Sequence, residues 1–126
     1  MSAPVRSVIT GGPGVGKSTL LNAAAKAGMT TFAEVARIIL RTPGGMAMRA
    51  LRPAEFADAM LEAEIAAFEA AGEGVSLYDR GFPDIVGFLR LEGLPVPVEL
   101  DHACRTLRYN GPIFRGPPWK EIFVQD

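Results

Sequence analysis

The sequence contains almost none of the residues that build disulfide frameworks and structural metal centres. Its 126 residues include one cysteine, Cys104, and one histidine, His102. A single cysteine excludes an internal disulfide, and nothing in the sequence resembles paired metal-ligand cysteines. His102 has no evident partner in the sequence, which favours a surface or capping role over catalysis. This scarcity is typical of a reduced, cytoplasmic setting.

Long hydrophobic runs and an excess of charge of one sign are missing as well. No apolar stretch approaches the roughly 20 residues of a membrane-spanning helix. A glycine-rich segment begins at Gly11, too early to leave room for a signal peptide before it. The net charge of -1 provides no general attraction to nucleic acid or to an anionic membrane. We therefore expect neither as a partner, while an oligomer is compatible with the sequence.

The remaining sequence has the length and composition of a single α/β domain over residues 1–126. Short β-branched or apolar segments predict strands, and longer periodic segments predict helices. The strands are expected over 5–10, 29–33, 75–79 and 111–118, and the helices over 17–28, 34–41, 54–72, within 79–93 and over 97–108. The segment TPGGMAMRALRP, residues 42–53, is expected to be a mobile connection. This alternation predicts a parallel sheet with helices on both faces.

The segment GGPGVGKST, Gly11 to Thr19, matches the phosphate-loop pattern G-x-x-x-x-G-K-[ST] at every fixed position. A predicted strand precedes it and a predicted helix begins at its lysine, which weakens the alternative of a glycine turn that matches by chance. Successive backbone N–H groups at a helix N-terminus form an anion site, and glycines let the backbone approach phosphates closely. The residues expected to contact a nucleotide are Gly12, Pro13, Gly14, Val15, Gly16, Lys17, Ser18 and Thr19.

Three of these residues carry side-chain chemistry. Lys17 is expected to be a charge that reaches solvent and contacts the β- and γ-phosphates. The Ser18 hydroxyl is expected to ligate Mg²⁺, and Thr19 to contact the α-phosphate.

A second group of chemically competent residues lies in DRGFPD, residues 79–84. Asp79 stands where a predicted core strand ends, which is the edge of a parallel sheet at which ligands bind. Its carboxylate is suited either to holding Mg²⁺ or to accepting a proton from an attacking hydroxyl. Arg80 is suited to neutralising a transferring phosphoryl group. Asp84 falls in the first turn of the next helix, where a carboxylate is favourable even without a function.

Glu64 is an exception in the pattern of the long helix over 54–72. Glu55, Asp58, Glu62 and Glu69 share one side of that helix, whereas Glu64 falls among apolar positions. Because a buried carboxylate without a partner is costly, we expect Glu64 to meet a cation, a hydroxyl-bearing ligand or solvent.

Four segments together resemble a known family: GGPGVGKST, AEVAR, LYDRGFPD and GPIFRGPPWKEIFVQD. The resemblance is to predicted P-loop ATPases and kinases of AAA type, related to the ribosylnicotinamide kinase domain of NadR and to nucleoside and nucleotide kinases. It covers nearly the whole chain and implies a kinase-like sheet of strand order 2-3-1-4. The fifth strand and the arginine-bearing lid of such kinases have no counterpart here, which leaves three alternatives: compensation by Arg105 and Arg108, an arginine from another subunit, or a C-terminally incomplete domain.

The resemblance also implies roles for individual residues. Glu34 occupies the position of the base that faces the substrate hydroxyl, and Asp79 and Arg80 those of the residues that serve the metal and the phosphates. Mg²⁺ and ATP are the implied ligands, with GTP not excluded. From the residues alone, Glu34 is equally suited to a salt bridge with Arg37, three positions further along a helix.

The acceptor of the phosphoryl group remains open at this point. A small-molecule kinase with a hydroxyl or phosphate acceptor, which a nucleoside would satisfy, is the first interpretation. An ATPase or GTPase with water as acceptor is the second. A nucleotide-dependent binding module with little turnover is the third.

Overall fold

A computed structural model of the protein describes residues 4–10 and 17–115. The predicted contact residues Gly12, Pro13, Gly14, Val15 and Gly16 lie outside the described residues. The chain forms two compact units. The sheet unit contains Met1–Phe32, Ala71–Arg80 and Tyr109–Asp126, and the helical unit contains Ala33–Ala70 and Gly81–Arg108.

The described helices and strands follow the predicted alternation, with one additional helix. In chain order they are β1 (Val5–Thr10), α1 (Lys17–Lys26), β2 (Thr30–Phe32), α2 (Val35–Leu40), α3 (Gly45–Leu51), α4 (Pro53–Glu69), β3 (Val75–Asp79), α5 (Phe82–Leu91), α6 (Val98–Thr106) and β4 (Ile113–Arg115). Within the described ranges, no helix is both long enough and apolar enough to cross a membrane.

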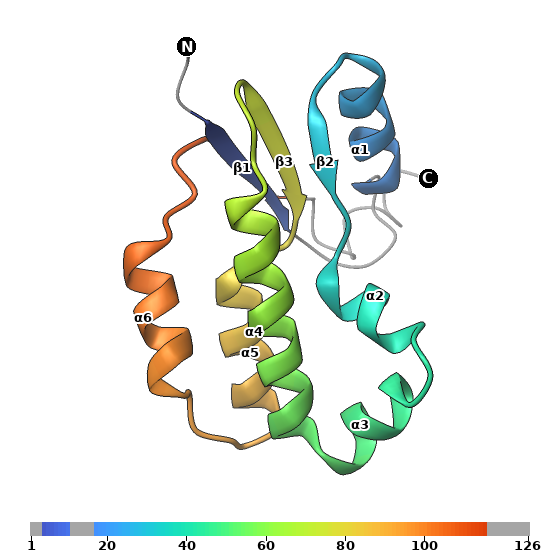
Figure 1. Ribbon diagram of the computed structural model, residues 1–126, viewed down its shortest axis with the longest axis vertical. Coiled ribbons are helices and arrows are strands. Elements are labelled where there is room, and N and C mark those ends of the chain that lie inside the picture. The colour runs from blue at the N-terminus through green and yellow to red at the C-terminus, as the bar shows by residue number, and fades with distance from the viewer. Residues whose placement is uncertain (1–3, 11–16, 116–126) are drawn as a thin grey trace, which may run out of the picture. The chain divides into compact units, whose positions relative to one another are not determined.

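The sheet unit is built on four parallel strands in the order β2-β3-β1-β4. This confirms the predicted strand order 2-3-1-4, and Figure 1 shows β1, β3 and β2 side by side. β1 and β3 pair from Val5 opposite Val75 to Ile9 opposite Asp79. Asp79 therefore ends the strand that lies directly beside the strand leading into the phosphate-loop segment.

α1 packs on one face of this sheet. Ile9 of β1 and Leu77 of β3 form a buried cluster with Ala24 of α1, to which Leu21 and Met29 add partly buried side chains. Figure 1 shows α1 alongside β2. Burying these apolar side chains fixes the helix on the strands and thereby fixes the position of Lys17, its first residue.

The helical unit is organised around α4, against which the shorter helix α5 packs (Figure 1). Phe56 and Phe68 of α4 meet Phe88 and Phe82 of α5, with ring centroids 5.4 and 6.0 Å apart. The acidic side of α4 is exposed, as its spacing predicts. Glu64 lies on the opposite side and is 3% exposed, so its predicted placement among apolar positions is confirmed.

The expectation of a mobile connection over 42–53 was wrong, because most of this segment is the helix α3. Pro43 and the two glycines dominated the sequence pattern, but the residues after them, MAMRAL, are mostly strong helix formers. Gly44 supplies the left-handed turn before the helix, with φ of 80°. The Arg49 guanidinium then lies 5.6 Å from the Phe88 ring centroid, a cation–π contact that ties α3 to α5.

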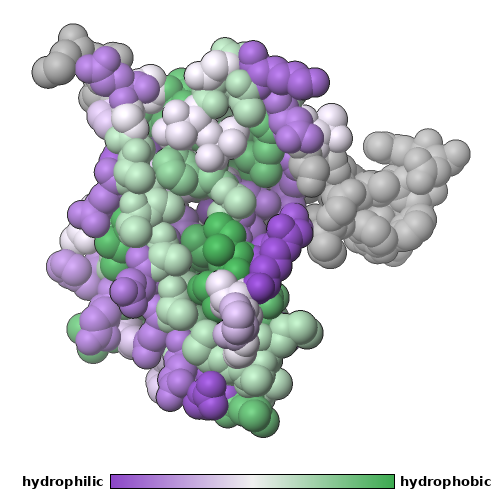
Figure 2. Space-filling view, turned by 45° about the vertical axis from the view of Figure 1, so that its right-hand side comes forward, coloured by the Kyte–Doolittle hydropathy of each residue, from purple (hydrophilic) through white to green (hydrophobic). Residues whose placement is uncertain are grey.

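Hydrophobic residues reach the surface among hydrophilic ones (Figure 2). In the helical unit the exposed large hydrophobic side chains are those of Ile38, Met46, Leu51, Leu91 and Val98. Exposed apolar residues of this kind are common on folded domains, and by themselves they identify no partner.

The segment before β4 is held against the edge of β1 by backbone and amide contacts. The Arg6 N–H donates to Asn110 Oδ1 at 2.8 Å, and the Gly111 N–H donates to the Arg6 carbonyl at 2.8 Å. A Cβ added to Gly111 would overlap Ser7 Oγ and lie 3.0 Å from the Arg6 carbonyl oxygen. Only glycine therefore fits this close approach.

We expect Gly111→Ala to lower the free energy of unfolding by about 1–3 kcal/mol, the usual cost of inserting a methyl group into a packed site. Gly87→Ala is the matched control, because Gly87 lies within α5 and a Cβ there would meet nothing within 4 Å. The control should raise stability by about 0.5–1 kcal/mol. Urea denaturation of both variants measures the difference, and equal effects would contradict the described packing.

Candidate functional site

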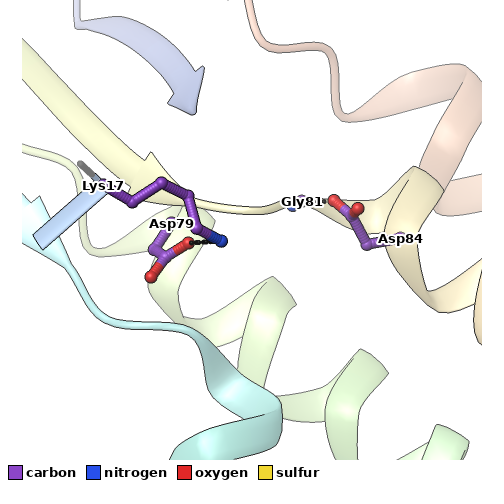
Figure 3. A network of polar contacts seen from close by, with 4 residues as sticks. All are labelled: Lys17, Asp79, Gly81 and Asp84. Atoms are coloured by element: carbon purple, nitrogen blue, oxygen red, sulfur yellow. Dashed lines mark hydrogen bonds and ion pairs between the residues drawn. The ribbon is translucent and has the colours of Figure 1, made fainter. Parts of the chain in front are cut away.

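A lysine and an aspartate from different elements of the sheet unit meet as an ion pair. Lys17 is the first residue of α1 and Asp79 is the last residue of β3. Lys17 Nζ lies 3.1 Å from Asp79 Oδ1, and Figure 3 shows the two side chains pointing toward each other. The side chains are 6% and 7% exposed. The expectation that Lys17 reaches solvent was therefore wrong, since Asp79 holds its amine in a buried position.

Because the pair is buried, separating the two charges costs more free energy than separating a surface pair would. Each charge has lost most of its contact with water, and the short separation compensates for that loss only while both partners are present. A cationic amine and a carboxylate thus converge at one point beside the start of a helix. An amine there is suited to binding phosphate, and a carboxylate to binding a hard cation such as Mg²⁺.

Arg80 extends the pairing of β1 and β3 by one residue, with its N–H donating to the Ile9 carbonyl at 2.9 Å. Its backbone is left-handed, with φ of 70°. A residue other than glycine is uncommon in this region, and such strain is found most often at functional sites. The chain therefore changes direction sharply right after Asp79, at the edge of the sheet where parallel strands end.

Asp84 has a structural role within the helical unit. Its Oδ2 accepts a hydrogen bond from the Gly81 N–H at 2.8 Å and closes the first turn of α5 (Figure 3). This capping contact alone explains an acidic residue at the position. The sequence offered this interpretation, because a carboxylate is favourable in the first turn of a helix.

We expect Asp84→Ala to lower the free energy of unfolding by about 1 kcal/mol through loss of this cap. Asp58→Ala, on the exposed acidic side of α4, should change it by less than about 0.5 kcal/mol. Chemical denaturation measures both values. If the two variants were equally stable, the assignment of Asp84 to helix capping would be wrong.

The other predicted site residues stand at the ends of elements. Ser18 and Thr19 are the second and third residues of α1, and Thr19 is exposed. Glu34 directly precedes α2, and its carbonyl accepts the Ile38 N–H at 3.3 Å. Glu34 comes two residues after Phe32, the last residue of β2. Phe32 in turn pairs with Tyr78 of β3.

Cys104 and His102 do not form a reactive centre. Burial raises the pKa of the Cys104 thiol, and the Asp101 carboxylate raises it further. The thiol therefore stays protonated at neutral pH and is a poor nucleophile. His102 is exposed, as expected for a surface residue. No group of three or more histidine, cysteine or acidic residues suited to a metal occurs in the described part of the chain.

Two features of the sheet unit were not predicted from the sequence. The first is the pairing of Lys17 with Asp79. The sequence could have indicated it, because it places a lysine at the start of a helix and an aspartate at the end of a neighbouring strand. The second is a row of aromatic rings, in which Phe32 stacks on Tyr78 with centroids 4.6 Å apart and Tyr109 meets Tyr78 edge-on at 5.5 Å. Phe32 and Tyr78 are directly opposite each other on the paired strands β2 and β3, so their side chains lie on the same face of the sheet.

A family model described as an AAA domain matches residues 6–126. The chain belongs to the AAA domain family. A search of curated proteins found no match. Membership of the AAA domain family agrees with the parallel sheet and its strand order, and it places the chain among nucleotide-binding P-loop proteins. AAA domains of this kind generally bind nucleotide together with Mg²⁺.

Proposed function

We propose that the protein binds ATP with Mg²⁺ and transfers the γ-phosphoryl group to a hydroxyl of a small acceptor. The observation that carries this proposal is the buried meeting of Lys17 and Asp79 at the junction of α1 and β3. The two groups match the two charges that a metal–nucleotide complex brings, because phosphate oxygens need a cation and Mg²⁺ needs a carboxylate. The phosphate-loop pattern immediately before Lys17 supports the same assignment.

In this proposal Lys17 binds the β- and γ-phosphate oxygens, and the segment that matches the phosphate-loop pattern contributes backbone N–H donors. Ser18 and Asp79 hold Mg²⁺, which when bound withdraws charge from the phosphate oxygens. Arg80 neutralises charge that builds up on the transferring group. The residues thus orient the phosphoryl group and stabilise its charge, which is most of what phosphoryl transfer requires.

Glu34 is proposed as the base that receives the acceptor's proton. The chain leaves the parallel strands β2 and β3 at the same edge of the sheet, and Glu34 follows β2 as Asp79 ends β3. The acceptor oxygen forms the new bond to the γ-phosphorus while the bond from that phosphorus to the bridging oxygen breaks. The hydroxyl proton passes to the Glu34 carboxylate, and ADP leaves.

A comparison of acceptors tests the proposal against its two rivals. ADP release is measured without acceptor and then with nucleosides, nucleoside monophosphates and nicotinamide riboside. Release that depends on one acceptor supports the kinase, whereas release that no acceptor changes identifies an ATPase. Tight binding without release identifies a binding module and contradicts the proposed transfer.

Nucleotide is also expected to stabilise the fold, because it binds only the folded state. At 100 times its Kd, ATP with Mg²⁺ should add about 2.7 kcal/mol to the free energy of unfolding. The gain should shrink when EDTA removes the metal. Thermal unfolding measured with ATP, with Mg²⁺ and with both gives the comparison; equal melting temperatures in all three would contradict metal-assisted binding.

A further inference from the structure

Positive charge is concentrated on one surface of the helical unit. The basic surface consists of α2, α3 and the residues that follow each of them, 35–52 in all, and its only charged residues are arginines. All of them are exposed: Arg37, Arg41, Arg49 and Arg52. The net charge of the whole chain is -1, so this excess of positive charge is local and must be balanced elsewhere on the protein.

The basic surface also carries large apolar side chains. Ile38, Met46 and Leu51 are 52%, 72% and 74% exposed. Arginine beside exposed apolar groups is typical of protein interfaces, because its hydrocarbon stem packs on them while the guanidinium binds an acidic partner. Arg41 forms no ion pair with any of residues 4–10 and 17–115. The arginines therefore indicate what the apolar residues alone do not, namely an acidic partner.

The matching negative charge lies on the next helix, α4, which α2 and α3 both contact (Figure 1). Residues 53–69 contain no lysine, arginine or histidine. Ala59 and Ala66 lie on the same side of α4 as its exposed carboxylates, and such small side chains let another element approach closely. We call this side the acidic surface; its carboxylates are those of Glu55, Asp58, Glu62 and Glu69.

The basic and acidic surfaces adjoin within one chain. Arg52 Nε and Glu55 Oε2 form an exposed ion pair of 2.9 Å at the point where they meet. A two-fold axis beside this point would place the basic surface of one copy over the acidic surface of the other, and the reverse contact would form at the same time. Such a contact is self-complementary and closes as a dimer.

We propose that two copies of the chain associate in this way, with the basic surface of each copy bound to the acidic surface of the other. The inference goes beyond the proposed function and does not depend on it. A second copy uses both surfaces and offers the alanine side of α4 to Ile38, Met46 and Leu51. An anionic membrane would use the basic surface alone and would repel the carboxylates beside it.

The salt dependence of self-association is the first test. The charges are exposed, and they act over about 30 Å at 0.01 M salt but only about 3 Å at 1 M. Sedimentation velocity should show dimers that depend on protein concentration at low salt. We expect the dissociation constant to rise at least about tenfold at high salt. A wild type that stays monomeric at both salt concentrations, up to millimolar protein, would overturn the proposal.

An exchange of charges tests which surfaces meet. Arg37→Glu with Arg41→Glu makes the basic surface more acidic, and Asp58→Lys with Glu62→Lys makes the acidic surface more basic. Each double variant alone should self-associate at least about tenfold more weakly than the wild type. A mixture of the two should form mixed dimers, and a chain with all four changes should dimerise again, which also shows that the changed surfaces fold. Failure of both to associate would contradict the pairing.

Arg90→Glu with Arg108→Glu is the matched control, because it changes the net charge as much as the first variant does, at exposed positions outside both surfaces. It should dimerise like the wild type; loss of its dimers would show that net charge, and not the two surfaces, controls association. Vesicles of phosphatidylglycerol test the membrane. A monomeric wild type that co-sediments with them, but not with phosphatidylcholine, and that loses this binding in Arg37→Glu with Arg41→Glu, would replace the second copy by a lipid surface.

Discussion

Lys17→Ala is expected to weaken binding of ATP with Mg²⁺ by more than about 100-fold, because phosphate oxygens lose their charged donor. Calorimetry of the variant and the wild type measures the ratio. Lys26→Ala is the matched control, since it removes an exposed lysine from the same helix. A folded Lys17→Ala protein that bound ATP as tightly as the wild type would contradict the assignment of the phosphate site.

The same substitution is expected to reduce stability, because it leaves Asp79 buried without its partner. Breaking a buried pair from one side costs about 3–5 kcal/mol, a large share of the stability of a domain of this size. Adding Asp79→Asn to Lys17→Ala removes the unpaired charge and should recover part of this loss. Urea denaturation of the single and double variants distinguishes loss of the fold from loss of the ligand.

Glu34→Gln and Asp79→Asn are expected to fail in different ways. Losing an acceptor-side base should lower phosphoryl transfer by about 10²–10⁴-fold while the affinity for ATP with Mg²⁺ stays nearly unchanged. Losing a metal-side carboxylate should slow hydrolysis as well and reduce the dependence on Mg²⁺. Rates with and without acceptor, measured over a range of Mg²⁺ concentrations, separate the two profiles.

Glu62→Gln is the control for this pair, because Glu62 is exposed on the acidic side of α4. Identical profiles for Glu34→Gln and Asp79→Asn would overturn the division of roles. Full acceptor-dependent activity in Glu34→Gln would do so too. Asp79 would then be the better candidate for the base, and Glu34 a salt-bridge partner of Arg37.

The strands were predictable because local signals agreed with the tertiary structure, whereas their order was expected only from the family resemblance. Val5–Thr10 and Val75–Asp79 are short apolar or β-branched segments, and the helices between them require parallel pairing. α3 was missed for the opposite reason, since Pro43, Gly44 and Gly45 indicate a turn and obscured the helix formers behind them. Glycine and proline mark where an element begins, but they do not determine whether the next residues form a helix.

The site was predictable residue by residue but not as a set of contacts. Lys17 and Asp79 were each predicted as site residues from the sequence around them. They are 62 positions apart, so no local sequence pattern could predict that they are in contact. Their pairing results from the docking of α1 on β1 and β3, which apolar side chains determine. Asp84 is the opposite case, because its role could be predicted locally: its one hydrogen bond lies within its own turn.

Two-dimensional amide NMR of the 13.4 kDa protein, titrated with ATP and Mg²⁺, is the most direct test of the nucleotide site. The account predicts saturable shifts in the amides of Lys17, Ser18, Thr19, Asp79 and Arg80, with small changes along α6. Shifts confined to other parts of the chain, or none at millimolar ATP in a folded sample, would contradict it.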